Sequence, residues 1–147
     1  MSLGQYQEAL TAFNESLEIK PNDFNAWFKK FMVLEYLGNY QDALKAIEKA
    51  IEIQPDDFNT WFRKSTILER LNNYEDALKA IEKAIEIQPN SFEAYFCQGL
   101  ILMNLQRLSE AKQSIENALT YGDSSFVPDD IRNSIQNLAQ AIYSNTQ

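Results

Sequence analysis

Apolar residues recur along the chain with the spacing of helices. From Asp42 to Pro55 the sequence reads DALKAIEKAIEIQP. Five of its apolar residues are one, three, three and one positions apart, which places them on one side of an α-helix: Ala43, Leu44, Ile47, Ala50 and Ile51. Lysine and glutamate occupy the other side and predict a solvated surface with weak ion pairs. The same pattern predicts helices at residues 5–20, 22–37, 40–53, 56–71, 74–87, 90–105, 108–121 and 128–143.

This stretch is also an internal repeat. It returns letter for letter from Asp76 to Pro89, 34 residues later, and Pro21, Pro55 and Pro89 follow the same interval. A fixed period of this length is typical of solenoid arrays, in which each unit buries its apolar face against its neighbours. We therefore predict an all-α fold built from helix pairs.

Turn residues separate the predicted helices. Gly38-Asn39 and Asn72-Asn73 can adopt a positive φ or cap the next helix. Each proline is followed by two residues that could cap a helix, namely Asn22-Asp23, Asp56-Asp57 and Asn90-Ser91.

The two ends of the chain depart from the period. The first predicted helix matches the second half of a repeat without its first half, so we expect an excised fragment whose Leu10, Phe13 and Leu17 lack a partner helix and promote self-association. At the other end Asp123 replaces the next proline. A stripe of apolar residues then predicts a helix that caps the array, and the alternative is that this helix binds a partner. The stripe consists of Ile131, Ile135, Leu138 and Ile142.

Residues 4–121 resemble the tetratricopeptide repeat (TPR) family. Trp27 and Trp61 stand at the family's tryptophan position, where Tyr95 replaces it in the next unit, and the small-residue position holds Ala43, Ala77 and Ala111. The Leu-Gly pair of the family is replaced by Lys30-Phe31, Lys64-Ser65 and Gln98-Gly99. The resemblance implies a right-handed α-solenoid of antiparallel helix pairs, a TPR-like superhelix. It also implies these divisions: 1–3 as a cloning remnant, 4–23 as half a repeat, 24–57, 58–91 and 92–125 as complete repeats, and 126–147 as a capping helix with a tail.

The resemblance further implies a protein-protein interaction scaffold, in which the first helices of the repeats line a concave groove that holds a peptide or helix of a partner. At 100° per residue, Trp27, Phe31 and Leu34 share the core side of the first complete repeat's first helix. Another side carries the candidate groove residues, which the period extends to the next two repeats. They are Asn25, Phe28, Met32, Glu35, Tyr36, Asn59, Phe62, Thr66, Glu69, Arg70, Glu93, Phe96, Leu100, Met103 and Asn104.

Three of these residues, Phe28, Phe62 and Phe96, would form a ladder that suits an extended partner with an apolar side chain at every third residue. The alternative is that they pack against neighbouring helices. Glu35 and Glu69 favour a partner with lysine or arginine, unless they are only solvated surface.

Composition narrows the function classes. The chain has 147 residues and a formal net charge of −8, which disfavours nucleic acid and anionic membranes as partners. Because Cys97 is the only cysteine and histidine is absent, we expect no disulfide, no metal site, no cofactor and no catalytic activity, and Cys97 is expected to be a packing residue.

We therefore predict a cytoplasmic protein-binding module whose partner is another protein, apolar and basic in character. The alternative is a structural spacer or oligomerisation arm of a larger regulatory protein or enzyme, with the groove unused.

Overall fold

The computed structural model describes residues 3–122 together with 133, 136–137, 140–141 and 144. Its helices are α1 (Leu3–Ile19), α2 (Phe24–Tyr36), α3 (Tyr40–Ile53), α4 (Phe58–Arg70), α5 (Tyr74–Ile87), α6 (Phe92–Asn104) and α7 (Leu108–Tyr121), and residues 3–122 contain no strand. The apolar stripe of the predicted capping helix, Ile131, Ile135, Leu138 and Ile142, lies outside the described residues.

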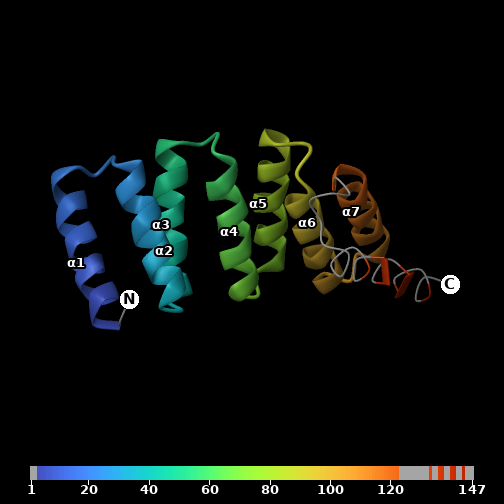
Figure 1. Cartoon of the computed structure of the whole chain (residues 1–147), viewed down its shortest axis with the longest axis horizontal. Helices are drawn as coiled ribbons and strands as arrows, with labels where there is room; N and C mark the ends of the chain where they lie inside the picture. The colour runs from blue at the N-terminus through green and yellow to red at the C-terminus, as the bar shows by residue number, and fades with distance from the viewer. Residues whose placement is uncertain (1–2, 123–132, 134–135, 138–139, 142–143, 145–147) are drawn as a thin grey trace. The chain divides into compact units, whose positions relative to one another are not determined.

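The chain divides into two compact units, Met1–Asn73 and Tyr74–Gln147. In the first unit, α2 packs against both α1 and α3, and α3 packs against α4; in the second unit, α6 packs against both α5 and α7. Within each unit the helices reverse direction at short turns, as Figure 1 shows. The predicted helix pairs are thus confirmed.

The core of the first unit joins α2, α3 and α4. Phe31 is fully buried in it, with Leu34 from the same helix, Ile47 from α3 and Ile67 from α4. Ala43 and Ala46 complete this core cluster, and their small side chains allow the backbones of adjacent helices to approach closely. Trp27, predicted on the core side, is half-buried and packs against this cluster, and its Nε1 donates a hydrogen bond to the carbonyl of Pro21 at 2.8 Å.

The first helix of each pair begins two residues later than predicted, because the second residue of each candidate pair is the cap. The side chains of Asp23, Asp57 and Ser91 accept hydrogen bonds from backbone N–H groups three residues on, at 3.0, 2.8 and 3.1 Å. All three residues have extended backbone conformations, which an N-cap requires. The predicted starts of these helices at 22, 56 and 90 are therefore wrong by two residues.

These helices also share one type of C-terminal turn. Gly38, Asn72 and Gln106 follow the period and have φ values of 71°, 57° and 57°. After α2, the N–H of Gly38 bonds to the carbonyl of Glu35 and the N–H of Asn39 to that of Leu34, which is the Schellman arrangement. The sequence predicted the turns at Gly38 and Asn72. It did not predict the turn at Gln106, because glutamine rarely adopts a positive φ.

None of the helices among the described residues is both long and apolar enough to span a membrane.

The cap assignment can be tested with neighbouring aspartates. Asp57→Ala removes the bond to the Thr60 N–H and is expected to lower the free energy of unfolding by about 0.5–2 kcal/mol, measured by urea denaturation. Asp56→Ala makes the same charge change at an exposed residue and is expected to cost no more than about 0.5 kcal/mol. Equal losses for the two variants would contradict the assignment.

Candidate partner-binding surface

The predicted groove residues of α2 differ in how far they are available to a partner. Met32 and Tyr36 are exposed, at 48% and 67%, and Asn25 is exposed as well. Phe28 is half-buried and packs against the core cluster, and its ring stacks on Phe24 with centroids 5.9 Å apart. The exposed apolar surface of α2 is therefore centred on Met32 and Tyr36.

The other two phenylalanines of the predicted ladder share with Phe28 a stacking partner in their own helix. Phe62 stacks on Phe58 at 5.8 Å, and Phe96 stacks on Phe92 at 6.0 Å. Each ring is half-buried and lies one helical turn after its partner. Packing within the helix therefore accounts for part of the burial of each ring, and each ring keeps some exposed surface.

Glu35 already has a basic neighbour. Its Oε2 lies 3.7 Å from Nη1 of Arg63 in α4, a residue outside the predicted set. Both side chains are partly exposed, so the pair contributes little to stability. That Glu35 favours a partner with lysine or arginine stays a prediction, and such a partner would compete with Arg63 for this carboxylate.

The remaining predicted residues have mixed environments. In α4, Asn59 and Arg70 are exposed, Glu69 is half-buried, and half-buried Thr66 donates a hydrogen bond to the Arg63 carbonyl at 2.8 Å. In the second unit Glu93 accepts a hydrogen bond from Ser91 at 3.1 Å, and Asn104 donates one to the Leu100 carbonyl at 3.0 Å. Leu100 and Met103 are half-buried.

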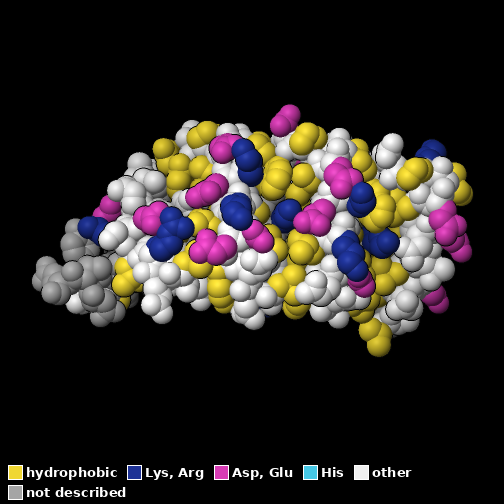
Figure 2. Space-filling view, turned by 180° about the vertical axis from the view of Figure 1, so that it is seen from behind, with side chains coloured by type: hydrophobic (Ala, Val, Ile, Leu, Met, Phe, Trp, Pro, Cys, Tyr) yellow, Lys and Arg dark blue, Asp and Glu magenta, His cyan; other side chains and the backbone are white. Residues whose placement is uncertain are grey.

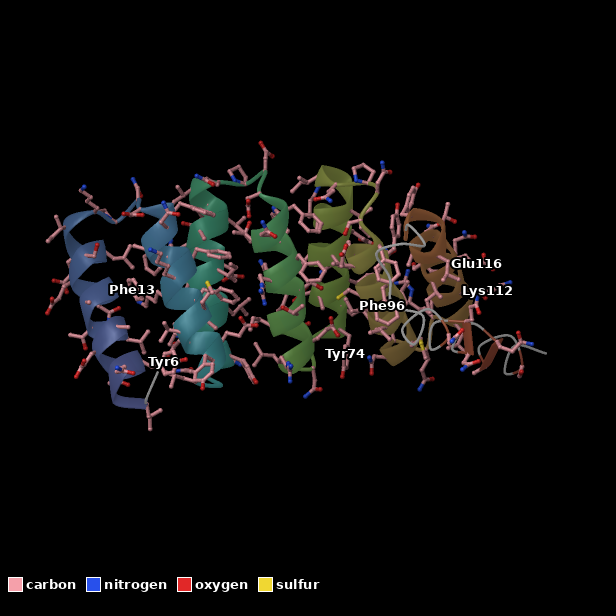
Figure 3. The ribbon with its side chains drawn as sticks, in the orientation of Figure 1. Tyr6, Phe13, Tyr74, Phe96, Lys112 and Glu116 are labelled. Carbon is pink, nitrogen blue, oxygen red and sulfur yellow. The ribbon has the colours of Figure 1, made fainter. Side chains whose placement is uncertain are left out.

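An apolar pocket lies in the seam between α1 and α2. It has a volume of about 360 Å³ and is lined by Tyr6, Ala9, Phe13, Lys29, Met32, Val33 and Tyr36. Figure 3 shows Tyr6 and Phe13 extending from α1 on its α2 side. Met32 and Tyr36 were predicted as binding residues, whereas the other five were not. The sequence feature that pointed to them is the first predicted helix without a partner, on which Phe13 was already expected to lack cover.

Two tyrosines that line this pocket contact each other. The rings of Tyr6 and Tyr36 lie 4.2 Å apart between centroids and are tilted by 30°. Desolvation of the phenol, together with its hydrogen bond to Tyr36, raises the pKa of Tyr6 above its ordinary value. The Tyr6 hydroxyl therefore stays neutral near pH 7.

The expectation that the apolar residues of α1 lack cover was partly wrong. Leu17 is buried at 7% exposure, and Leu10 packs against the core cluster. Leu17 is covered because α2 packs along α1, whereas Leu10 is only half-buried. Phe13 is also half-buried, and it lies at the pocket of α1 and α2.

Sequence comparison establishes the family. A tetratricopeptide repeat profile matches residues 1–58 and 28–92, and a second tetratricopeptide repeat profile matches residues 80–113. The chain belongs to the tetratricopeptide repeat family. A search of curated protein sequences found no significant match.

Solved structures share the TPR fold. MamA from Desulfovibrio magneticus RS-1 has 22% identity and a TM-score of 0.76, with 97% of this chain and 84% of that chain covered. The Yersinia enterocolitica type III secretion chaperone SycD, in complex with a peptide of the translocator YopD, has 13% identity and a TM-score of 0.78 over 84% and 94% of the two chains. YrrB, described as a TPR protein with an unusual peptide-binding site, has 23% identity and a TM-score of 0.73 over 82% and 62%.

The chain spans less than two thirds of some of these proteins: 62% of YrrB and 64% of one further MamA structure. At this identity the likeness shows an all-α TPR solenoid fold. The predicted repeat boundaries stay predictions.

The outer face of the TPR helices carries paired charges. Lys45 lies 2.8 Å from Asp42, and Lys79 lies 2.8 Å from Asp76 at the same place in the next unit. The hydrogen bond from Lys45, with a further one from Asn39, lowers the pKa of Asp42. Figure 2 shows acidic and basic side chains lying next to one another on one face. The predicted solvated surface with weak ion pairs is confirmed.

Other chemistry finds little support among the described residues. Cys97 is buried at 8% exposure, as predicted for a packing residue. Within residues 3–122 no group of three or more acidic or cysteine side chains is placed to hold a metal ion.

Because the pocket is open, truncating Phe13 is expected to lower stability less than truncating its counterpart in α3. Ile47 is fully buried at the position in α3 that Phe13 holds in α1. Ile47→Ala is expected to cost about 2–5 kcal/mol in urea denaturation. Phe13→Ala removes more atoms but is expected to cost only about 1–2 kcal/mol, because one side of that ring is already in water. A larger loss for Phe13→Ala would show that its face is covered.

Proposed function

We propose that this TPR chain is a protein-interaction scaffold that holds an apolar peptide or helix of a partner protein in a groove lined by the first helices of its repeats. The exposure of Met32 and Tyr36 on α2 carries this proposal, because large apolar side chains left on the surface next to a pocket are typical of binding sites.

The structures of similar fold support a protein partner. SycD is in complex with a peptide of the translocator YopD, and YrrB is described as having an unusual peptide-binding site. The half-buried phenylalanine pairs would supply rigid apolar contacts in each repeat. The Glu35–Arg63 pair makes the basic character of the partner a weaker expectation than its apolar character.

A second candidate is that the chain serves as a structural spacer or an oligomerisation arm. The observation that favours it is the exposure of Leu3 and Ile19 on α1, at 74% and 80%. Apolar side chains of this kind can pair with a second copy as readily as with a different protein.

The groove can be tested with peptides selected from a random library for binding to the chain. The double variant Met32→Ala/Phe62→Ala removes one groove side chain from each of α2 and α4, and we expect affinity to fall roughly tenfold for each side chain that contributes about 1.4 kcal/mol. Isothermal titration calorimetry measures this fall.

The control is Leu3→Ala, which truncates an exposed apolar residue of α1 outside the groove set and is expected to leave affinity unchanged. Circular dichroism verifies that each variant is folded. Unchanged affinity in a folded double variant would rule out peptide binding in the groove. The role as a spacer or oligomerisation arm would then remain.

A further inference from the structure

A basic pocket lies where α1, α2 and α3 meet. It has a volume of about 710 Å³ and shares no residue with the predicted groove set or with the apolar pocket of α1 and α2. Its charged lining residues are Lys30 of α2 and Lys45, Lys49 and Asp42 of α3, so three lysines outnumber one acidic residue. The pocket is therefore locally positive on a chain whose formal net charge is −8.

The three lysines differ in their partners. Lys45 lies 2.8 Å from Asp42, and Lys49 lies 2.7 Å from Glu52. Lys30, by contrast, has no carboxylate of the described residues within ion-pair distance.

Lys30 is half-buried, and an aromatic ring covers its charge in part. Its Nζ lies 4.9 Å from the centroid of the Trp27 ring, which is a cation–π contact. Asp42 is near enough for a weak charge interaction with Lys30, but this carboxylate accepts its hydrogen bonds from Lys45 and Asn39. The ammonium of Lys30 thus has a ring beside it and no counter-ion of its own.

The next repeat shows the same lysine with a carboxylate. Lys64 of α4 is the counterpart of Lys30, 34 residues on, and its Nζ lies 2.9 Å from Oε1 of Glu48 in α3 and 5.6 Å from the ring of Trp61. The counterpart of Glu48 is Asn14 of α1, which is neutral. Both repeats therefore have the lysine and the aromatic ring, whereas only the later one supplies the carboxylate.

The helix at the position of the missing carboxylate is present in the structure. In the next repeat the carboxylate comes from α3, and the counterpart of α3 is α1, whose Asn14 lines the basic pocket. Because α1 already holds this position, the missing carboxylate does not belong to another helix of the array.

The fold does not need a lysine at this position. In α6 the counterpart is Gln98, which is also half-buried and whose Oε1 accepts a hydrogen bond from the Ser114 hydroxyl of α7 at 2.8 Å. A neutral side chain is thus accommodated, whereas a half-buried charge without a counter-ion is unfavourable. Lys30 retains a charge that packing does not require.

We propose that the basic pocket binds the carboxylate of a glutamate or aspartate from a partner protein, which takes at Lys30 the position that Glu48 holds at Lys64. The side-chain amides of Asn14 and Gln7 line the pocket and can donate further hydrogen bonds to this carboxylate. The site goes beyond the proposed function, because it lies outside the groove and takes an acidic segment.

The pocket suits a side chain on a protein segment better than a free ion. Besides its lysines it is lined by Leu10 and Leu37, which are half-buried and offer apolar contacts to the methylene groups and neighbours of an acidic residue. The exposed Lys45 and Lys49 pairs are weak, so both lysines can turn toward an incoming carboxylate.

The probe is the capped tripeptide Leu-Glu-Leu, compared with Leu-Gln-Leu in NMR titrations of the full chain. The indole N–H signals of the two tryptophans report on the two positions, because Trp27 lines the basic pocket and Trp61 lies beside the Lys64–Glu48 pair. With the glutamate peptide we expect a saturable shift of the Trp27 signal and none of the Trp61 signal. The glutamine peptide is expected to bind roughly fivefold more weakly, or less.

Removal of one charge tests the role of Lys30. Lys30→Gln introduces the residue that α6 accommodates at this position, and it is expected to weaken binding of the glutamate peptide roughly fivefold or more. Lys29→Gln makes the same change in net charge at the neighbouring residue, which is exposed and outside the basic pocket, and is expected to have little effect.

A carboxylate supplied by the chain itself tests the position of the ligand. Asn14→Glu reproduces the arrangement of Glu48 and is expected to compete with the glutamate peptide and weaken its binding to a similar extent. Ala12→Glu makes the same charge change at an exposed residue of α1 outside the pocket and is expected to leave binding nearly unchanged. Circular dichroism verifies that all four variants are folded.

Several results would overturn the proposal. They are the absence of a saturable shift at Trp27, equal weakening by Lys29→Gln and Lys30→Gln, and equal weakening by Ala12→Glu and Asn14→Glu. Acetate or inorganic phosphate that binds as tightly as the glutamate peptide would make this a site for free anions and would exclude the protein segment. The Met32→Ala/Phe62→Ala variant is expected to bind the glutamate peptide normally, so the outcome here is independent of the groove.

Discussion

The packing of a first helix against the alanine and isoleucine of a second helix is the interaction on which each unit depends. In the first unit Ala43 and Ile47 lose all contact with water because α2 covers them, and in the second unit α6 covers Ala111 and Ile115. Neither face could be buried within its own helix. The small side chain of alanine allows the close approach, and the isoleucine supplies the apolar area.

The same need for a covering helix explains the apolar surface of α1. Ala9 and Phe13 present an apolar face of the kind that is covered elsewhere, and the seam with α2 is an apolar pocket. The lysines of α3 and α5, by contrast, are paired with acidic residues of their own helix, and such exposed pairs give little selectivity among binding partners. We therefore expect the apolar residues Met32, Tyr36 and Phe13 to contribute more to partner specificity than these charges.

Much of the fold was predictable because it repeats. The 34-residue period and the apolar stripes predicted all the helices from α1 to α7, and α3, α5 and α7 match their predicted bounds. The first helices of the pairs were predicted two residues too long at the start, because the sequence offers two adjacent capping residues and only backbone geometry selects Asp23 over Asn22. The turn at Gln106 was missed because a glutamine there carries no conformational preference for a positive φ.

The candidate site was harder to predict. Helical periodicity places Met32 and Tyr36 on an exposed side of α2, and the structure agrees, but it cannot say which residues of α1 meet them. Leu10 and Leu17 were expected to lack cover, yet α2 packs along α1 and buries Leu17, whereas Leu10 and Phe13 are half-buried. The Glu35–Arg63 contact likewise depends on how α2 and α4 pack, which no local pattern in the sequence encodes.

Solvent access to three alanine methyl groups tests this account most directly. Methyl NMR spectra of the chain can be recorded with a soluble gadolinium chelate, which broadens signals near water. We predict strong broadening for Ala9 and little for Ala43 and Ala111, since only the first lacks a covering helix. Equal protection of the three methyl groups would contradict the account, because it would mean that the face of α1 is already covered.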